Sequence, residues 1–383
     1  MATFVFMFFR DVPGQSELKS LFRALHASGK VPHALLLSEP AGSGALSLAL
    51  AFARLLNCSA PKDGEGCGRC TSCLQYSGMA HPDLILSFPI VKPASESDFH
   101  SEHLLPEFRK AVLNDPFLSL QDWRGLMDPG NKQAIIPVRE ASRLMRSCGL
   151  KNFGGAFRVV LIWQAQKMNA ESGNKLLKLI EEPPEGTLFI LIAPSASDLL
   201  STIVSRCQLV HVPPLSQDDI AQRLMSEHTH DRDKAQMAAS LAEGDLRQAV
   251  RLLELDDTLL QYTEWFVQLT RICYAARLPD LLNWTTELGK STRDELIAFF
   301  RFSAHFLEES TRSRSGLKVY ESPALARTGF KMNVFSQLMP LAGVEQIAEG
   351  FGRSIENVQR NVHAKLILFN LGIDMMRAFK AKE

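Results

Sequence analysis

Short, unbroken apolar runs recur along the first part of the chain, with stretches of helical periodicity between them. The runs are HALLLS (33–38), DLILSF (83–88), RVVLIW (158–163), LFILIA (188–193) and CQLVHV (207–212). Runs without polar alternation are typical of parallel strands that are buried on both faces. We therefore predict an α/β fold for the first two thirds of the chain, with a parallel sheet between helices.

The strand pattern ends at VPPLSQDD, residues 212–219. Two prolines cannot continue a strand ladder, and Ser216 followed by Asp219 three residues later is typical of a helix start. Residues 216–258 show helical periodicity alone, and no strand pattern follows them. These changes predict three domains: an α/β domain over 1–213, a small helical lid over 214–259 and a C-terminal helical domain over 260–383.

Two further segments affect this organisation. A mixed polar stretch over 92–131 interrupts the α/β pattern, and we interpret it as an insertion with a short helix over 102–113. Near the C-terminus, apolar residues repeat at a spacing that places them on one helix face: Ala364, Ile367, Leu368, Leu371 and Met375. This stripe indicates the core of a helix bundle or a subunit interface.

The composition adds limits on function. The chain has 383 residues, of which 46% are apolar and 22% charged, enough for two or three hydrophobic cores. Lys plus Arg equals Asp plus Glu at 42 each, so no net field draws the whole molecule to nucleic acid or membrane. The apolar opening MATFVFMFFR lacks a basic leader and is about half the length that spans a bilayer. We interpret it as a buried N-terminal segment and expect a cytoplasmic protein.

Four of the seven cysteines lie in the short stretch CSAPKDGEGCGRCTSC. The spacing C-x8-C-x2-C-x2-C belongs to Cys58, Cys67, Cys70 and Cys73. In a reducing compartment clustered thiols favour a metal over disulfides, and four thiolates suit tetrahedral zinc. Incidental buried cysteines, a redox pair and an iron–sulfur cluster are the alternatives. Because four protein ligands leave no position for water, we expect a structural role for this site.

A glycine-rich turn follows the first predicted strand. A phosphate-binding loop has the pattern G-x-x-x-x-G-K-[ST], in which the lysine contacts phosphates and the hydroxyl binds magnesium. The aligned octet here is EPAGSGAL, residues 39–46. Gly42 and Gly44 remain, whereas the other three positions carry Glu39 for glycine, Ala45 for lysine and Leu46 for the hydroxyl residue. Taken alone, the loop is equally consistent with an ordinary strand-to-helix turn.

The strand over 158–163 shows a second loss. In such ATPases an acidic pair at the end of this strand holds magnesium. Trp163 and Gln164 occupy the two positions here, and neither binds magnesium as a carboxylate does. The two losses together predict that the chain binds no ATP in its own site and does not hydrolyse it.

Several stretches, in order, resemble the clamp loader of bacterial DNA polymerase III, within the AAA+ superfamily. They are FRDVPGQSELKSLFRALHASGKVPHALLLSEPAGSG, NKLLKLIEEPPEGTLFIL, LLSTIVSRCQLV and GDLRQAV. The resemblance covers most of residues 8–253 except the insertion, and weakly 361–375. It implies an AAA+ type sheet domain, a helical lid and a collar, and the four cysteines match the zinc module of the family. The motor subunits, gamma and tau, keep the lysine and the acidic pair, whereas delta-prime subunits can lack them, and the sequence resembles this second type.

The resemblance also implies roles for two arginines. In clamp loaders a Ser-Arg-Cys motif, here Ser205, Arg206 and Cys207, presents an arginine finger to ATP bound by the neighbouring subunit. A guanidinium stays charged and matches phosphate oxygens, which suits this task. A surface arginine that only caps a turn is the alternative. Arg247 aligns with the second sensor of the lid, where we favour packing or an ion pair. The usual polar residue of the first sensor is Ala193, which fits an inactive site.

The function that the resemblance implies is a non-catalytic stator. It completes a ring with gamma/tau motor subunits and a delta subunit, and it supports loading of the sliding clamp onto primed DNA. The main alternative is an autonomous ATPase in which Ser43 or Ser47 replaces the lost hydroxyl, although the loop contains no replacement lysine. A zinc-ribbon adaptor that binds nucleic acid by itself is a third possibility, which the neutral charge balance disfavours.

Overall fold

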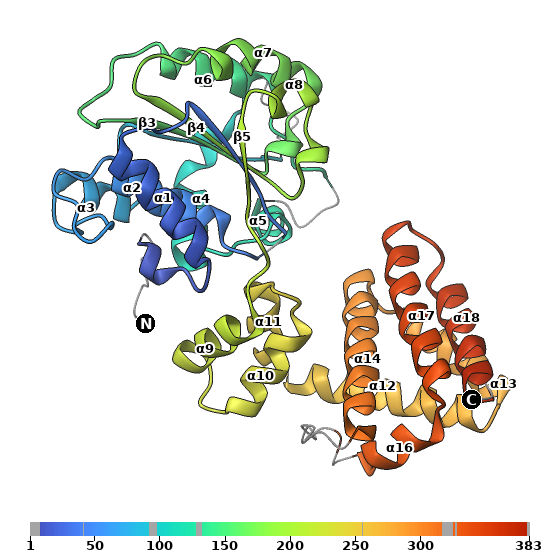
Figure 1. Cartoon of the computed structure of the whole chain (residues 1–383). Coiled ribbons are helices and arrows are strands. Elements are labelled where there is room, and N and C mark those ends of the chain that lie inside the picture. Colours follow the sequence, from blue (N-terminus) through green and yellow to red (C-terminus); the bar gives the residue numbers. More distant parts are fainter. Residues whose placement is uncertain are drawn as a thin grey trace. The chain divides into compact units, whose positions relative to one another are not determined.

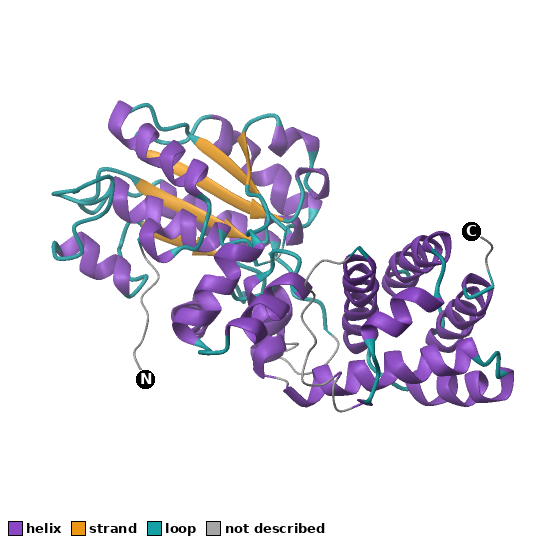
Figure 2. Cartoon of the chain, turned by 60° about the horizontal axis from the view of Figure 1, so that its bottom comes forward, coloured by secondary structure: helices purple, strands orange, loops and turns teal. Residues whose placement is uncertain are grey.

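The computed structural model describes residues 8–40, 42–91, 98–127, 132–254, 256–315, 325 and 328–380. The opening residues 1–7 and two parts of the insertion, 92–97 and 128–131, lie outside the described residues. The chain divides into two compact units: Met1–Leu224 with Glu243–Gln248, and Met225–Ala242 with Ala249–Glu383. All the described strands belong to the first unit, and the described part of the second is helical (Figure 2).

The first unit is built on a parallel sheet of five strands. They are β1 Ala34–Ser38, β2 Leu84–Ser87, β3 Arg158–Trp163, β4 Thr187–Ala193 and β5 Gln208–His211. Their order across the sheet is β2-β3-β4-β1-β5, and every neighbouring pair is parallel. All residues of β2, β3 and β4 are buried. The predicted α/β fold is confirmed, and each strand lies on one of the apolar runs.

Helices cover both faces of this sheet (Figure 1). One face packs against α1 Ser16–Ser28, α2 Ala45–Leu56, α3 Thr71–Ser77, α4 Leu105–Asn114 and α5 Leu120–Met127. The other face packs against α6 Val138–Cys148, α7 Ala170–Glu181 and α8 Ser201–Val204. Because strand side chains alternate between faces, Leu35 and Leu37 of β1 join the first core and Leu36 joins the second.

Local sequence signals explain where these elements begin and end. The Asn169 side chain accepts the backbone N–H of Ser172 and so caps α7. Pro183 and Pro184 prevent α7 from continuing, and Gly186, with φ of 71°, turns the chain into β4. The helix expected over 102–113 begins three residues later in the structure, as α4. A 3₁₀ turn over Ser101–Leu104 precedes it. The first turn of α4 contains a proline, which suits a helix start.

The helix predicted after the prolines is also present. It is α9 Gln217–Glu227, where the hydroxyl of Ser216 accepts the backbone N–H of Asp219 at 3.1 Å. Further along the chain lie α10 Arg232–Leu241, α11 Leu246–Glu254, α12 Asp256–Tyr274, α13 Leu278–Leu288, α14 Arg293–Arg314, α16 Met332–Leu338, α17 Leu341–Gln359 and α18 Ala364–Ala378.

The second unit is a helix bundle. Its C-terminal helix, α18, packs on α12, α13 and α17, and it buries four residues of the predicted stripe: Ile367, Leu368, Leu371 and Met375. Gly372 allows α18 to approach Leu281 of α13, because a Cβ at this glycine would lie 2.5 Å from the leucine Cδ1. Among the described residues, no helix has both the length and the apolar character needed to cross a membrane. The proposed boundaries at residues 213 and 259 stay a prediction.

Candidate functional site

The glycine-rich turn joins β1 to α2, as the sequence predicts. Gly42 and Gly44 have φ of 74° and 93°, in the left-handed region that glycine tolerates best. Gly44 is the N-cap of α2. The first N–H groups of a helix that follows such a turn form a site for an anion. The described part of the turn therefore keeps two glycines with positive φ directly before a helix start.

Glu39 places its own carboxylate at this helix start. Glu39 Oε2 accepts the backbone N–H of Ala45, which stands at the position of the missing lysine, at 2.7 Å. Glu39 is only 9% exposed. Burial raises its pKa to about 7 although the Ala45 N–H opposes the shift, and the charge of Asp245 adds to it. An incoming phosphate would meet an occupied donor and, above neutral pH, a like charge.

Glu39→Gln is expected to stabilise the chain above neutral pH. The pKa of Glu39 is about 7 in the folded protein against an ordinary value of 4.5, so ionisation lowers stability as the pH rises between these values. The full cost, about 3 kcal/mol, applies above pH 7. Urea unfolding should show the variant more stable by about 3 kcal/mol at pH 8 and by less than about 1 kcal/mol at pH 5. The same difference at both pH values would contradict this assignment.

The end of β3 holds no magnesium ligand. Trp163 is 1% exposed, and its ring lies against Phe108 of α4 with 5.5 Å between centroids. The side-chain oxygen of Gln164 accepts a hydrogen bond from Gln166 at 2.7 Å. Ala193, at the end of β4, is buried. The positions expected for an acidic pair and a first sensor therefore contain an indole, a locally bonded amide and a methyl group.

Arg247 pairs with two aspartates of the insertion. Its Nε lies 2.9 Å from a carboxylate oxygen of Asp115 and 3.5 Å from one of Asp122. These three side chains are 20 to 30% exposed, so the ion pairs are partly shielded from water. This geometry supports the interpretation of Arg247 as an ion-pair residue.

Arg206 lies just after α8 and contacts the end of α7. Its Nε donates to Glu181 Oε2 at 2.7 Å, and its Nη1 donates to the Thr202 carbonyl at 2.9 Å. The hydroxyl of Ser205 donates to the same carbonyl. Burial raises the pKa of the neighbouring Cys207 to about 11, so this thiol stays protonated. The Arg206 side chain is 30% exposed and that of Glu181 is 52% exposed, so this ion pair is open to solvent.

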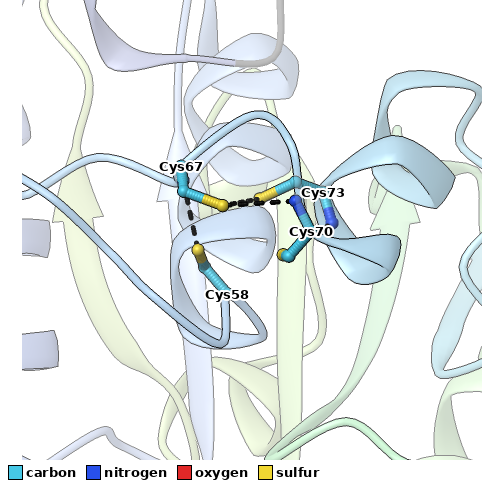
Figure 3. A group of neighbouring side chains, drawn as sticks. All are labelled: Cys58, Cys67, Cys70 and Cys73. Atoms are coloured by element: carbon cyan, nitrogen blue, oxygen red, sulfur yellow. Dashed lines mark hydrogen bonds between the residues drawn. The ribbon is translucent and has the colours of Figure 1, made fainter.

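The four clustered cysteines meet beside the start of α3 (Figure 3). Their Sγ atoms all lie within 4.8 Å of one another, and the Sγ atoms of Cys67 and Cys73 are 4.0 Å apart. Four sulfurs bound at about 2.3 Å to a tetrahedral ion are about 3.8 Å from one another. The arrangement can hold a metal ion, as the cysteine spacing predicts.

Backbone N–H groups support three of these sulfurs. Cys67 N–H donates to Cys58 Sγ at 3.1 Å, Cys70 N–H to Cys67 Sγ at 3.3 Å and Cys73 N–H to Cys70 Sγ at 3.4 Å. Backbone N–H groups lower the pKa of Cys67. Burial opposes ionisation of Cys70, yet hydrogen bonds from backbone N–H groups lower its pKa to about 6. At Cys58, burial raises the pKa, and a bound cation would offset this effect.

A buried guanidinium adjoins the cysteine cluster. Arg54 of α2 is 2% exposed, and neither its Nε nor its Nη1 has a hydrogen-bond partner among the described atoms. A Cβ on Gly66 would lie 3.1 Å from Arg54 Cγ and 3.2 Å from Cys73 Sγ, so both side chains border the same point. The ring of Phe8 covers the guanidinium at 3.8 Å. An unpaired buried cation is costly, whereas four thiolates around a divalent ion keep an excess of negative charge. Arg54 therefore fits a metal-loaded centre.

Sequence reasoning missed Arg54 and the aspartates around Arg247. A charged residue inside the apolar stretch AFARLL was the available signal for Arg54. Nothing in the local sequence marks the aspartates, because their partners are distant along the chain. Asp115 and Asp122 pair with Arg247, and Asp245 lies near Glu39.

Residues 14–216 match the protein family described as DNA polymerase III, delta subunit. The DNA polymerase III subunit tau of Escherichia coli is 30% identical over 251 residues, which are 64% of this chain and 32% of that protein. The subunit delta' of the same organism is 27% identical over 234 residues, 61% of this chain and 58% of that protein. The chain thus spans about a third of the tau relative and somewhat more than half of the delta' relative.

The fold was also compared with that of a solved structure, a DNA polymerase III gamma subunit-related protein of Thermotoga maritima. The aligned region covers 95% of this chain and 100% of that protein, with 12% sequence identity and a TM-score of 0.40. A superposition this loose has no bearing on function.

Proposed function

The chain belongs to the DNA polymerase III, delta subunit family of clamp-loader AAA+ proteins, and from this premise we propose that it is a non-catalytic stator subunit of the clamp loader. In this role it completes a ring with gamma/tau motor subunits and a delta subunit in the cytoplasm. The complex places the sliding clamp on primed DNA at the expense of ATP that other subunits bind. The helices of residues 260–383 form its part of the collar, and residues 214–259 are the lid.

The observation that carries this proposal is the state of the glycine-rich turn. Gly42 and Gly44 have positive φ directly before α2, yet the Ala45 N–H is bonded to Glu39 and no lysine is present in the turn. The acidic pair expected at the end of β3 is replaced by Trp163 and Gln164. These features support a chain that binds no ATP in its own site and has no ATPase activity.

Arg206, framed by Ser205 and Cys207, is the group that acts on ATP in this proposal. It reaches the nucleotide of the adjacent motor subunit, where its charge stabilises the transition state. The partly exposed ion pair with Glu181 holds the guanidinium in place before assembly. Such a pair contributes little stability, so the arginine can exchange it for phosphate oxygens at small cost.

The metal of the cysteine cluster is zinc in this proposal. Four sulfur ligands at near-tetrahedral spacing suit Zn²⁺, and a site closed by four protein ligands has a structural role. Cys58, Cys67, Cys70 and Cys73 would hold the ion and fasten the loop between α2 and α3. Zinc is the cofactor, and no ATP is expected in the chain's own site.

An autonomous ATPase is the competing proposal, and it needs a hydroxyl to replace the lost magnesium ligand. Ser43 donates its hydroxyl to the Pro40 carbonyl at 3.0 Å, and Ser47 donates to the Pro116 carbonyl at 3.2 Å. Both hydroxyl groups thus have partners within the protein. No feature of the described residues favours this alternative.

Reconstitution of the loader tests the stator role. Motor subunits, a delta subunit, the sliding clamp and primed DNA are mixed with or without this chain, and clamp loading is followed by fluorescence. We expect loading to require the chain, although the chain alone releases no phosphate from ATP. Equal loading in its absence would contradict the stator role.

A further inference from the structure

The insertion reaches the start of α2, where a nucleotide phosphate would lie. The Ser47 hydroxyl donates to the Pro116 carbonyl at 3.2 Å. Phe117 is 8% exposed, and a Cβ on Gly44 would lie 3.0 Å from its ring. Val12, from the N-terminal segment, lies on the same side at 3.3 Å from that point. The turn is therefore covered by side chains of this chain.

The insertion also reaches the end of β3. Phe108 of α4 contacts Trp163 and stacks on Phe88 with 3.9 Å between ring centroids. Trp123 of α5 meets both Phe88 and Phe108 edge-on, and its indole N–H donates to the Pro89 carbonyl at 2.8 Å. An aromatic cluster thus fills the space beside the position where magnesium ligands are missing.

Besides α2 and the end of β3, the insertion also contacts the segment 243–248. Arg247 pairs with Asp115 and Asp122 of the insertion. On the other side of the same segment, the Asp245 side chain lies against Gly42, and the Leu246 N–H bonds the Gly42 carbonyl at 3.4 Å. The segment is therefore held between the glycine-rich turn and the insertion.

The start of the insertion is itself anchored in the first unit. Glu140 of α6 is fully buried and accepts the N–H of Ser101 at 3.0 Å and its hydroxyl at 2.7 Å. Arg143 pairs with Glu140 and donates to the Leu86 carbonyl at 2.7 Å. The path of the insertion is fixed by buried polar contacts as well as by aromatic packing.

We propose that the insertion, in its described part 98–127, is a built-in substitute for nucleotide. This inference rests on the proposed function, in which the pocket at the start of α2 is non-catalytic. The insertion then has a role in that pocket. A bound nucleotide links a phosphate-binding turn to the segments around it. Here Phe117, Asp115 and Asp122 make the links to α2 and to the segment 243–248. This arrangement is permanent, so the chain keeps one conformation at this site while its partners bind and release ATP.

Hydrogen–deuterium exchange of the full chain tests the link to Arg247. The variant Asp115→Asn/Asp122→Asn keeps the shape of both side chains but removes their charge. We expect amides over 243–248 and in the first turn of α2 to exchange about tenfold faster, because charge-assisted contacts that close the pocket are lost. Arg247→Gln should give the same change, and combining all three substitutions should add little, since both variants remove one interaction.

Asp98→Asn is the matched control. It removes an ion pair between the insertion and Arg139 of α6, at a site away from the turn. Exchange over 243–248 should stay unchanged in this variant, and slow exchange within β3 shows that each protein is folded. Phe117→Ala keeps every charge and should speed exchange at the first turn of α2. Unchanged exchange in the Asp115/Asp122 variant, additive effects with Arg247→Gln, or unchanged exchange in Phe117→Ala would each overturn the proposal.

These results are separable from the test of the stator role. A loader that works without this chain would contradict the proposed function but would not affect the interpretation of the exchange results. Conversely, unchanged exchange in the insertion variants would overturn the substitute for nucleotide, while the loading requirement of the chain stayed intact.

Discussion

Arg206→Ala is expected to lower ATP turnover in the adjacent motor site by roughly a thousandfold, with the complex still assembled. The guanidinium has to supply positive charge to the phosphate oxygens as the γ-phosphate leaves, and alanine supplies none. The folded chain should tolerate the change, because the Arg206–Glu181 pair is partly exposed and contributes little stability. Single-turnover ATP hydrolysis by the reconstituted loader, with assembly checked by analytical ultracentrifugation, measures the effect.

Two matched variants separate charge from geometry. Arg206→Lys keeps the positive charge but loses the planar pair of donors, so turnover should recover only in part. Glu181→Gln frees Arg206 from its partner on this chain and should leave turnover at least as high as in the wild type. Full activity of the Arg206→Ala loader would show that this arginine only caps a turn.

Cys73→Ser is expected to abolish metal binding and to lower the free energy of unfolding by several kcal/mol. Cys73 is buried where the loop meets α3, and its loss leaves three thiolates and a hydroxyl that binds zinc weakly. The negative charge of the centre would decrease, and the buried Arg54 guanidinium would keep only its contact with the Phe8 ring. Metal content is measured by mass spectrometry, and stability by urea unfolding with and without a strong chelator.

Cys148→Ser is the control for this experiment. Cys148 is buried on the other face of the sheet, outside the cysteine cluster, and burial raises the pKa of its thiol to about 11. This variant should keep one zinc ion per chain, and the chelator should destabilise it as much as the wild type. A Cys73→Ser protein that retains its metal, or a wild type that the chelator leaves equally stable, would refute the metal centre.

Much of the fold could be predicted from the sequence because of how parallel sheets are buried. Strands covered on both faces need unbroken apolar runs, and RVVLIW became β3 without a shift at either end. Prolines and capping residues gave the ends of α7 and the start of α9 for equally local reasons. The order of the strands depends on contacts between distant segments, and the sequence alone did not determine it.

At the candidate site, too, local features could be predicted from the sequence and long-range contacts could not. The loss of the lysine and of the acidic pair is visible in the sequence, since Ala45 and Trp163 stand at fixed positions of a known pattern. The groups that fill the vacated space could not be predicted in this way. Asp115 meets Arg247 across more than a hundred residues of sequence, and Glu39 required the fold to bring its carboxylate back to the Ala45 N–H. Such pairings follow from the path of the chain and not from residue type.

A calorimetric titration of magnesium–ATP into the isolated chain, combined with a measurement of phosphate release, tests directly whether the chain has a nucleotide site of its own. We expect no saturable binding up to millimolar nucleotide and no release of phosphate, whereas a loader that contains the same chain hydrolyses ATP. Saturable binding with a micromolar Kd, together with turnover by the chain alone, would contradict this expectation.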